Sequence, residues 1–191
     1  MDGLRVLARP EAEVPRRLKL QVAELQNHAW PGEISAEPVH DPALRPLSLL
    51  LLDGDRVLAA LDVLSKPIVH AGRTYAASGL STVVVDPALR GRGHGRRLVA
   101  AARAAVADGG ADLGLFTCDR GLRGFYENAG WEPLPGAVLV GGTVEQPFPS
   151  DQEGFDKVVM AAFLTAHARR HRSDFPGSRI ALHPGTVDRL W

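Results

Sequence analysis

Hydrophobic positions in the first part of the chain follow a helical period. Val14, Leu18, Val22 and Leu25 recur every three or four residues, which places them on one face of a helix that opens at Pro10 and Glu11. Residues 3–8 read as a short strand before this helix. Residues 30–46 contain four prolines and little periodicity, so we expect a loop there.

From residue 47 onward the pattern changes to aliphatic runs that are separated by turn dipeptides. Residues 47–52 and 56–64 flank Asp53-Gly54, and residues 66–70 and 73–77 flank Ala71-Gly72. This arrangement predicts two successive hairpins. A β-branched run at 80–85 then predicts a further strand, which ends at Asp86-Pro87.

In the second half of the chain, predicted helices and strands alternate. We expect a helix at 95–107 that ends at Gly109-Gly110, a buried strand at 113–117, a short helix at 122–128, and strands at 136–142 and 157–164. Antiparallel strands followed by a strand–helix–strand pattern predict the α/β class, with one mixed sheet and helices on its faces.

The composition narrows the range of functions. The chain has 191 residues, 45% of them hydrophobic, with 22 basic and 22 acidic side chains, which suits one globular domain over 1–191. Zero net charge argues against general nucleic-acid binding. The only cysteine, Cys118, excludes an internal disulfide and fits a reducing cytoplasm. We find no signal peptide and no membrane-spanning run. The seven histidines lack metal-ligand spacing, so we predict no metal.

The densest positive charge lies in RGRGHGRR, residues 90–97, where Gly91, Gly93 and Gly95 occupy every second position. The expected helix follows directly. Helix N-termini expose unpaired amides, and glycines let an anion approach the backbone. The segment therefore predicts a phosphate cradle. It matches neither the Walker A spacing nor the dinucleotide fingerprint, and a merely flexible, basic turn is the alternative.

Two motifs resemble those of the GCN5-related N-acetyltransferase (GNAT) superfamily. Arg90-Gly91-Arg92-Gly93-His94-Gly95 is similar to its Arg/Gln-x-x-Gly-x-Gly/Ala loop, and GFYENAGW, residues 124–131, is similar to its Phe-Tyr-Glu-x-x-Gly-Trp/Phe helix. The similarity covers roughly residues 47–140 in the same order. It implies a GNAT-like, mostly antiparallel sheet flanked by helices, and acetyl-CoA as cosubstrate.

The resemblance also implies roles for individual residues. The pyrophosphate of acetyl-CoA would lie on the loop amides, and the pantetheine arm would pair with the preceding strand like an added strand. The implied cofactor-binding residues are Val83, Val84, Val85, Arg90, Gly91, Arg92, Gly93, His94, Gly95 and Arg96. Tyr126 would give a proton to the departing thiolate; an ordinary half-buried tyrosine is the alternative.

Within the superfamily, the chain most resembles aminoglycoside 2'-N-acetyltransferases, through GWEPLPG, an acidic patch before a late strand, and a terminal tryptophan. Those enzymes use a glutamate that acts through water, at the position of Ser81. Serine can position a water here but is no base at neutral pH. Candidate acceptor-binding groups are Asp151, Glu153, Asp188 and Trp191.

Other candidate groups follow from the residue types alone. His40, His70 and His183 are alternative bases. Asp119 is expected to cap the tyrosine helix, and Cys118 is expected to be a small core residue.

These observations lead to one expected function and two alternatives. We expect direct acetyl transfer from acetyl-CoA to a primary amine of a small molecule, with an aminoglycoside 2'-amine as the finer expectation. The core would extend to about residue 164, and residues 165–191 would cover the acceptor site. Transfer to a protein or peptide amine and a non-catalytic acyl-CoA-binding module stay open, as does a homodimer.

Overall fold

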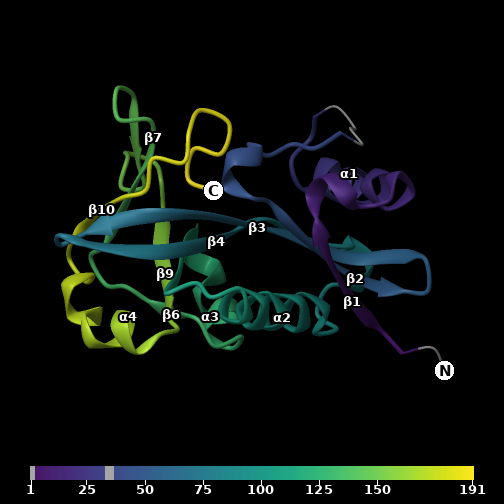
Figure 1. Cartoon of the computed structure of the whole chain (residues 1–191). Helices are drawn as coiled ribbons and strands as arrows, with labels where there is room; N and C mark the ends of the chain where they lie inside the picture. Colours follow the sequence, from purple (N-terminus) through teal and green to yellow (C-terminus); the bar gives the residue numbers. More distant parts are fainter. Residues whose placement is uncertain (1–2, 33–36) are drawn as a thin grey trace.

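A central sheet runs through the protein in this computed structural model, which describes residues 3–32 and 37–191 (Figure 1). The strand order is β1-β2-β3-β4-β5-β9-β6, and every neighbouring pair is antiparallel except β4 with β5. The strands are β1 (Arg5–Pro10), β2 (Leu47–Asp53), β3 (Arg56–His70), β4 (Arg73–Val85), β5 (Leu113–Asp119), β9 (Lys157–Phe163) and β6 (Glu132–Pro133). The predicted α/β class with a mixed, mostly antiparallel sheet is confirmed.

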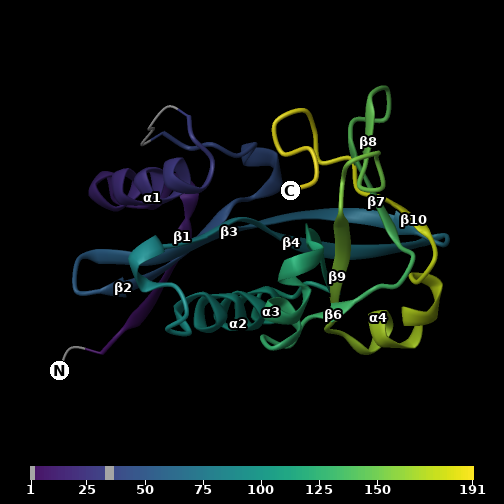
Figure 2. The same cartoon turned by 180° about the vertical axis from the view of Figure 1, so that it is seen from behind.

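Helices cover both faces of the sheet, as Figures 1 and 2 show: α1 (Arg16–Ala29) lies on one face, and α2 (His94–Asp108) lies on the other. This explains the unbroken run of four leucines in β2, residues 49–52. Leu50 packs in the cluster that contains Leu18 of α1, whereas Leu51 packs in the cluster that contains Leu98 of α2. Because a strand covered on both faces needs apolar side chains at every position, alternation is absent here.

The two predicted hairpins are parts of longer strands. β3 and β4 run without a break from Arg56 to Val85, except for the turn at Ala71-Gly72, where both residues have positive φ (46° and 73°). Pro67 does not interrupt β3, because β2 pairs with β3 only as far as Val63 and leaves an open edge beyond it.

The first helix begins later than predicted, and Val14 lies before it in an extended conformation, whereas the later helices begin close to where their sequence signals place them. A 3-10 turn (Glu11–Glu13) lies at the expected start of the first helix, and α1 begins only after Pro15. Helix α2 matches the prediction to within one residue at each end, and α3 (Arg123–Glu127) follows a 3-10 turn at Arg120–Leu122. The predicted Asp119 cap is wrong, since no side chain caps that turn and Asp119 accepts a hydrogen bond from Lys157 instead.

The parallel pair β4–β5 is joined at one end only. Two residue pairs connect the strands, Ala77 with Leu113 and Ser78 with Gly114, and beyond these pairs the strands separate. On the β3 side, β4 contains a bulge between Ser81 and Val84, where Thr82 has a φ of 49°. An unpaired stretch of β4 therefore faces the opening between the strands.

A small second sheet and the C-terminal segment cover one end of this opening. The sheet has the order β10-β7-β8, formed by β10 (Arg179–Ala181), β7 (Val138–Gly142) and β8 (Pro147–Pro149). A short helix, α4 (Ala166–Arg170), precedes β10 in the sequence. Lys66 of β3 donates hydrogen bonds to the Leu182 and His183 carbonyls. The segment after β10 thus returns across the sheet, and its end lies near the middle of the molecule (Figure 1).

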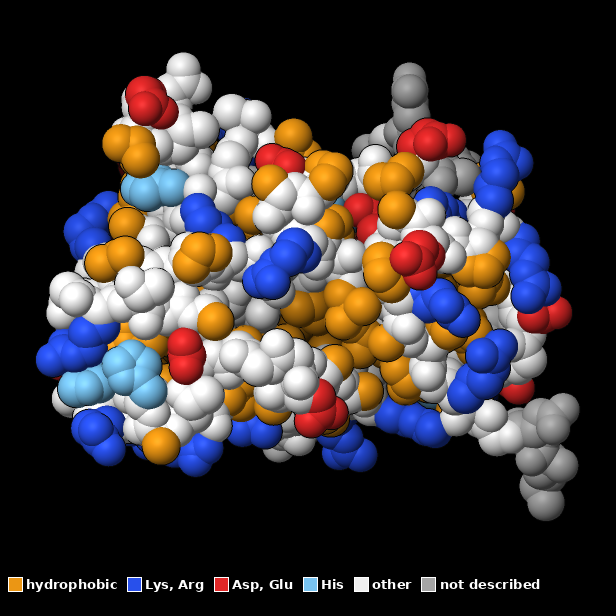
Figure 3. Space-filling view, viewed as in Figure 1, with side chains coloured by type: hydrophobic (Ala, Val, Ile, Leu, Met, Phe, Trp, Pro, Cys, Tyr) orange, Lys and Arg blue, Asp and Glu red, His pale blue; other side chains and the backbone are white. Residues whose placement is uncertain are grey.

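Hydrophobic side chains gather near the centre of the face in Figure 3, where one lysine or arginine side chain also lies, whereas most lysines and arginines are spread toward its rim. No single basic stripe crosses this face. None of the helices in residues 3–32 and 37–191 is long and apolar enough to cross a membrane.

Candidate functional site

The glycine–arginine loop leads directly into α2. Gly91 and Gly93 have φ values of 78° and 84°, which an L-residue with a side chain rarely adopts. Gly93 is the N-cap residue, its carbonyl accepts the first helical hydrogen bond from Arg97, and no side chain caps the helix. The amides at the start of α2 therefore stay available to an anion.

A cleft of about 870 Å³ opens above this helix start. All ten residues that the sequence predicted for the cofactor line it, together with Ala29, Leu89, Leu122, Phe125, Tyr126 and Asn128. Arg90, Arg92 and Arg96 are exposed and form no ion pair within the described part of the chain. The cleft thus combines uncapped amides, unpaired guanidinium groups and the end of β4.

Gly95 explains how closely α2 approaches the sheet. A Cβ atom there would lie 3.0 Å from Val85 and 3.2 Å from Phe125. The third glycine of the loop therefore serves the packing of the helix start against β4 and α3 rather than a turn.

Tyr126 lies on α3 at the inner end of the cleft. Its side chain is only 5% exposed and packs edge-to-face on Phe116 and Phe125. Burial, with smaller contributions from Cys118 and Asp119, raises the pKa of Tyr126 well above its ordinary value. The phenol is therefore protonated at neutral pH and can donate a hydrogen bond, for which the described residues offer no acceptor.

A second cavity, of about 310 Å³, lies between the diverging strands and is here called the acceptor cavity. It shares Val83, Leu122 and Tyr126 with the cleft. Its other lining residues are Trp30, Leu80, Ser81, Thr82, Thr117, Cys118, Asp119, Phe148, Phe155, Lys157, Arg189, Leu190 and Trp191. Tyr126 thus stands where the two spaces meet.

Trp191 closes the inner end of the acceptor cavity. Its indole Nε1 donates to the Leu115 carbonyl at 2.8 Å, and a Cβ at Gly79 would overlap the ring. The indole therefore occupies the gap between β4 and β5 just beyond their last paired residues. Arg189, Leu190 and Trp191 of the C-terminal segment form part of the lining of this cavity.

Ser81 lines the acceptor cavity and is 9% exposed. Its hydroxyl makes no hydrogen bond to the described residues, so it is free to hold a water there. Cys118, expected in the core, is buried but also lines the cavity. Burial raises the pKa of its thiol to about 11, so the thiol is protonated at neutral pH.

Three charged residues far apart in the sequence, His40, Asp62 and Asp188, meet in the interior and are here called the His40 cluster. His40 Nδ1 lies 2.6 Å from Asp188 Oδ1, and its Nε2 lies 3.2 Å from Asp62 Oδ2. Thr82, the left-handed residue of the bulge, donates to the same Asp62 oxygen at 2.8 Å. Two carboxylates outweigh the burial of the ring and raise the pKa of His40 to about 10.

The His40 cluster changes how two predicted residues are interpreted. His40 is an imidazolium at neutral pH and does not line the acceptor cavity, so it is not a general base. Asp188 is 8% exposed and is held by His40 and the Asp41 amide. Its carboxylate points into the interior rather than toward a substrate.

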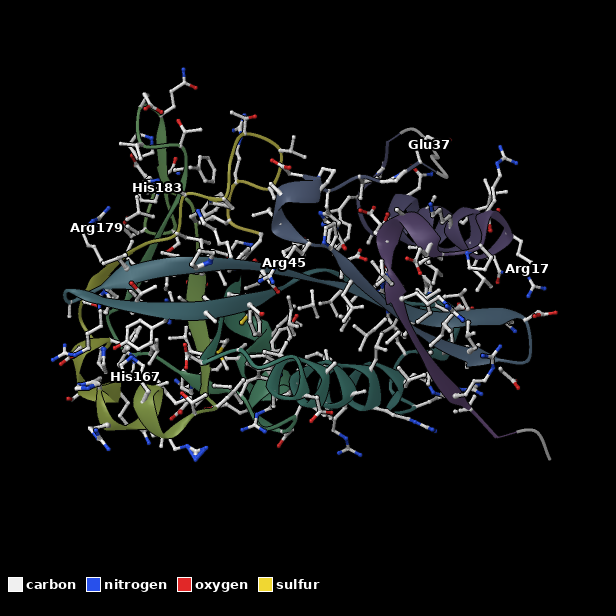
Figure 4. All side chains as sticks on the ribbon, viewed as in Figure 1. Arg17, Glu37, Arg45, His167, Arg179 and His183 are labelled. Carbon is white, nitrogen blue, oxygen red and sulfur yellow. The ribbon has the colours of Figure 1, made fainter. Side chains whose placement is uncertain are left out.

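The remaining predicted side chains lie apart from the acceptor cavity. Asp151 pairs with Arg179 at the outer edge of the small sheet (Figure 4), and Glu153 is exposed. His70 contacts the Asp174 carbonyl, and His183 lies beside β7, 3.2 Å from the Gly141 carbonyl (Figure 4). The structure therefore brings Ser81, Tyr126 and Trp191 together, but not the acidic residues.

Several cavity residues were not identified from the sequence. Phe148, Phe155, Lys157 and Arg189 form one wall of the acceptor cavity, and Trp30 lies at its rim. Each looks like an ordinary surface or strand residue in the sequence. Only Asp119 carried a signal, as a carboxylate directly after a buried strand. Residues 3–32 and 37–191 contain no group of three or more histidine, cysteine, aspartate or glutamate side chains arranged to hold a metal ion.

Comparisons with known proteins support the fold. The chain is similar to Escherichia coli YhbS, a GNAT family N-acetyltransferase solved in complex with CoA, with 21% identity over 95% of this chain and 91% of that one and a TM-score of 0.63. It is also similar to aminoglycoside 6'-N-acetyltransferase from Enterococcus faecium (17% identity, 83% and 97% covered, TM-score 0.58) and to Escherichia coli ElaA (15%, 83% and 99%, 0.59). Curated proteins gave no match.

A family model decides the assignment. The model described as "Acetyltransferase (GNAT) domain" matches residues 19–134, a span that contains the glycine–arginine loop, the diverging strands and Tyr126. The acetyl-CoA cosubstrate expected from the sequence agrees with this match and with the CoA complex of the similar structure. On this evidence, the chain belongs to the GNAT acetyltransferase family.

Proposed function

We propose that the protein transfers an acetyl group from acetyl-CoA directly to a primary amine of a small molecule. One observation carries this proposal: the cleft above the α2 amides and the acceptor cavity meet at Tyr126. A thioester held in the cleft and an amine held in the cavity would react at that point.

The cleft suits the nucleotide part of the cosubstrate. The pyrophosphate binds the amides of residues 91–96, and the exposed guanidinium groups of Arg90, Arg92 and Arg96 add charge-assisted hydrogen bonds. The pantetheine arm lies along Val83–Val85, where β4 has no β5 partner, so its amides can pair with the free strand edge. A backbone N–H of the bulge near Val83 or Val84 stabilises the oxyanion.

The transfer itself needs only a few protein groups. The amine nitrogen forms a bond to the acetyl carbon, the carbon–sulfur bond breaks, and the proton that the amine loses balances the one that the CoA thiolate gains. Tyr126 donates a hydrogen bond to the departing sulfur and is the group through which it receives a proton. Ser81 holds a water near the amine, and Asp119 is the one carboxylate among the described cavity residues that can take up its proton.

Two features support direct transfer to a small molecule. The high pKa of the Cys118 thiol disfavours an acyl-cysteine intermediate, because the thiolate is the nucleophilic form. The Trp191 ring blocks the acceptor cavity at its inner end, between β4 and β5, which favours a compact acceptor over a peptide chain that would run through it. An aminoglycoside 2'-amine is the finer expectation from the sequence.

Thiol release from acetyl-CoA in the presence of a panel of amines tests the proposal. We expect CoA release that depends on amine and an acetylated amine in the product by mass spectrometry. CoA binding by calorimetry without turnover on any amine would instead favour the non-catalytic acyl-CoA-binding module.

A further inference from the structure

One wall of the acceptor cavity alternates cations and aromatic rings. The Arg189 guanidinium lies 5.4 Å from the centroid of the Phe148 ring, the Phe148 and Phe155 rings meet edge-to-face at 5.6 Å, and Lys157 Nζ lies 5.4 Å from the Phe155 centroid. All four residues, here called the cation–aromatic wall, line the cavity. They belong to β8, β9, the connection between them and the C-terminal segment.

The two cations of the wall differ in their partners. Lys157 Nζ lies 2.6 Å from Asp119 Oδ1, so its charge is balanced. Arg189 has no carboxylate partner within residues 3–32 and 37–191. Among the side chains of the described lining residues, two cations (Lys157 and Arg189) therefore face one carboxylate (Asp119), so these side chains carry one positive charge in excess.

Arg189 is held by its backbone while its side chain is exposed. Its carbonyl accepts a hydrogen bond from the Gly142 amide at 2.8 Å, and a Cβ at Gly141 would overlap that carbonyl. The preceding Asp188 is fixed in the buried His40 cluster. The guanidinium thus presents its donors to the cavity from an anchored main chain, which lowers the entropy lost when it binds a ligand.

We propose that the acceptor is an amine that carries a carboxylate beside an aromatic ring, of the class of the aromatic amino acids. This inference rests on the proposed function. Arg189 binds the carboxylate through paired N–H donors, and the ring packs against Phe148 and Phe155. A polycation such as an aminoglycoside or a polyamine meets repulsion from Arg189 and finds only the already paired Asp119 carboxylate.

Matched amines that differ only in the carboxylate test this inference. We would compare phenylalanine with phenethylamine and tryptophan with tryptamine, and include kanamycin and spermidine as polycations. The wild-type protein should show a kcat/KM about tenfold or more higher for each carboxylated member, since a charge-assisted hydrogen bond is worth that much. Arg189→Gln should reduce this preference to about twofold, at the level of an uncharged contact, with CoA affinity unchanged.

Arg179→Gln is the matched control, because Arg179 belongs to the same segment but pairs with Asp151 outside the cavity. It should keep the wild-type preference. Equal rates for the members of each pair, or kanamycin or spermidine as the best acceptor, would overturn the inference while leaving the acetyltransferase function intact.

A binding measurement tests the acceptor class separately from the acetyltransferase function when turnover is absent. Calorimetric titration of phenylalanine and phenethylamine into the protein saturated with CoA reports on the cavity without catalysis. If the wild-type protein binds phenylalanine more tightly than phenethylamine, and Arg189→Gln abolishes this difference in affinity, the inference is supported even if the proposed function fails. Binding of neither amine, or of both equally, would overturn it.

Discussion

The indole Nε1 of Trp191 donates a 2.8 Å hydrogen bond to the carbonyl of Leu115, at the point where β4 and β5 part. A side chain therefore satisfies an acceptor that a neighbouring strand would otherwise pair. Along β4, Ser78 is the last residue that pairs with β5, and the next residue, Gly79, faces the indole. Residues 80–83 then line the acceptor cavity, and residues 83–85 line the cleft. Trp191 is thus the end wall of the path that leads inward from the cleft.

Removal of the indole should weaken the preference for acetyl-CoA over CoA thioesters with longer acyl chains. In Trp191→Ala the gap beside Gly79 is open, so a longer acyl group on CoA has room to extend toward the paired end of the strands. We expect the ratio of kcat/KM for hexanoyl-CoA to that for acetyl-CoA to rise about tenfold or more, in line with the discrimination that apolar pockets achieve. Steady-state thiol release with acetyl-, butyryl- and hexanoyl-CoA measures it.

Two variants control this prediction. Trp191→Phe keeps most of the ring volume and should keep the preference for acetyl. Trp30→Ala removes another tryptophan of the same cavity, one that is 56% exposed at the rim, and should leave the acyl ratio unchanged. A folded Trp191→Ala protein with wild-type chain-length selectivity would show that the indole does not limit the acyl group.

Tyr126→Phe should lower kcat about 100-fold, because the departing sulfur loses its hydrogen-bond donor. The Kd for CoA should change by less than about twofold, since the ring and its packing persist. Stopped-flow turnover and calorimetry separate the two quantities. Unchanged kcat would leave Tyr126 with a packing role only.

Tyr75→Phe is the matched control for Tyr126→Phe and is a prediction in its own right. Tyr75 is fully buried, and its hydroxyl has no hydrogen-bond partner among residues 3–32 and 37–191. Removal of an unsatisfied buried hydroxyl should raise the free energy of unfolding by about 1 kcal/mol, with turnover unchanged. Urea denaturation measures this, and a loss of stability would indicate that the hydroxyl has a partner.

Gly93→Val should weaken CoA binding about tenfold or more. A β-branched side chain resists the φ of 84° at this position and obstructs the approach of an anion to the helix amides. Calorimetry with CoA measures the effect. Gly54→Val is the control, since it places the same strain (φ of 57°) in a distant hairpin turn; it should cost stability but leave the CoA Kd unchanged. Equal CoA Kd values for wild type and Gly93→Val would falsify the proposal that the glycine–arginine loop binds the phosphates of CoA.

His40 should make stability depend on pH through the neutral and alkaline range. Its pKa is raised from 6.5 to about 10 in the folded protein, so its contribution is complete below about pH 6.5 and is lost as the pH rises through about 10. His40→Asn leaves two buried carboxylates without their cation and should lower the unfolding free energy by about 3 kcal/mol at pH 6. The difference from wild type should shrink between pH 7 and 10.

Denaturant unfolding of both proteins across this range provides the measurement. Comparison of the pair removes the contribution of Cys118, whose pKa burial also raises. His28→Asn, an exposed histidine on α1, should behave like wild type. A constant difference between wild type and His40→Asn from pH 6 to 10 would mean that His40 does not titrate in this range.

The grouping of the cleft residues was predictable because their signals are local in sequence. The loop glycines, the valines of β4 and Tyr126 occur within short motifs, and the structure places them around one cleft. Local turn chemistry also located the hairpin at Ala71-Gly72. The length of β3 and β4 was missed, because a proline at position 67 reads as a break unless the open edge of β3 is known.

The acceptor side could not be predicted, because long-range packing creates it. His40 meets Asp188 from 148 positions away, and an aspartate that ends up inside the protein cannot be distinguished in sequence from a surface ligand. Arg189 acquires its place only when the C-terminal segment binds β7. Asp119 resembles a helix cap by position, but the nearby Lys157 is a stronger partner for its carboxylate.

The two-residue junction of β4 and β5 has a mechanical consequence. The sheet forms two plates that share one main-chain junction at the paired ends of β4 and β5; across the gap beyond it they are joined by side chains, among them the Trp191 indole on the Leu115 carbonyl and the α2 residues of the shared core. The spacing of the plates is thus fixed by side chains instead of by main-chain ladders. Point substitutions in the C-terminal segment, which is remote from the glycine-rich loop in sequence, can therefore change the width of the gap between β4 and β5 without altering the fold of either plate.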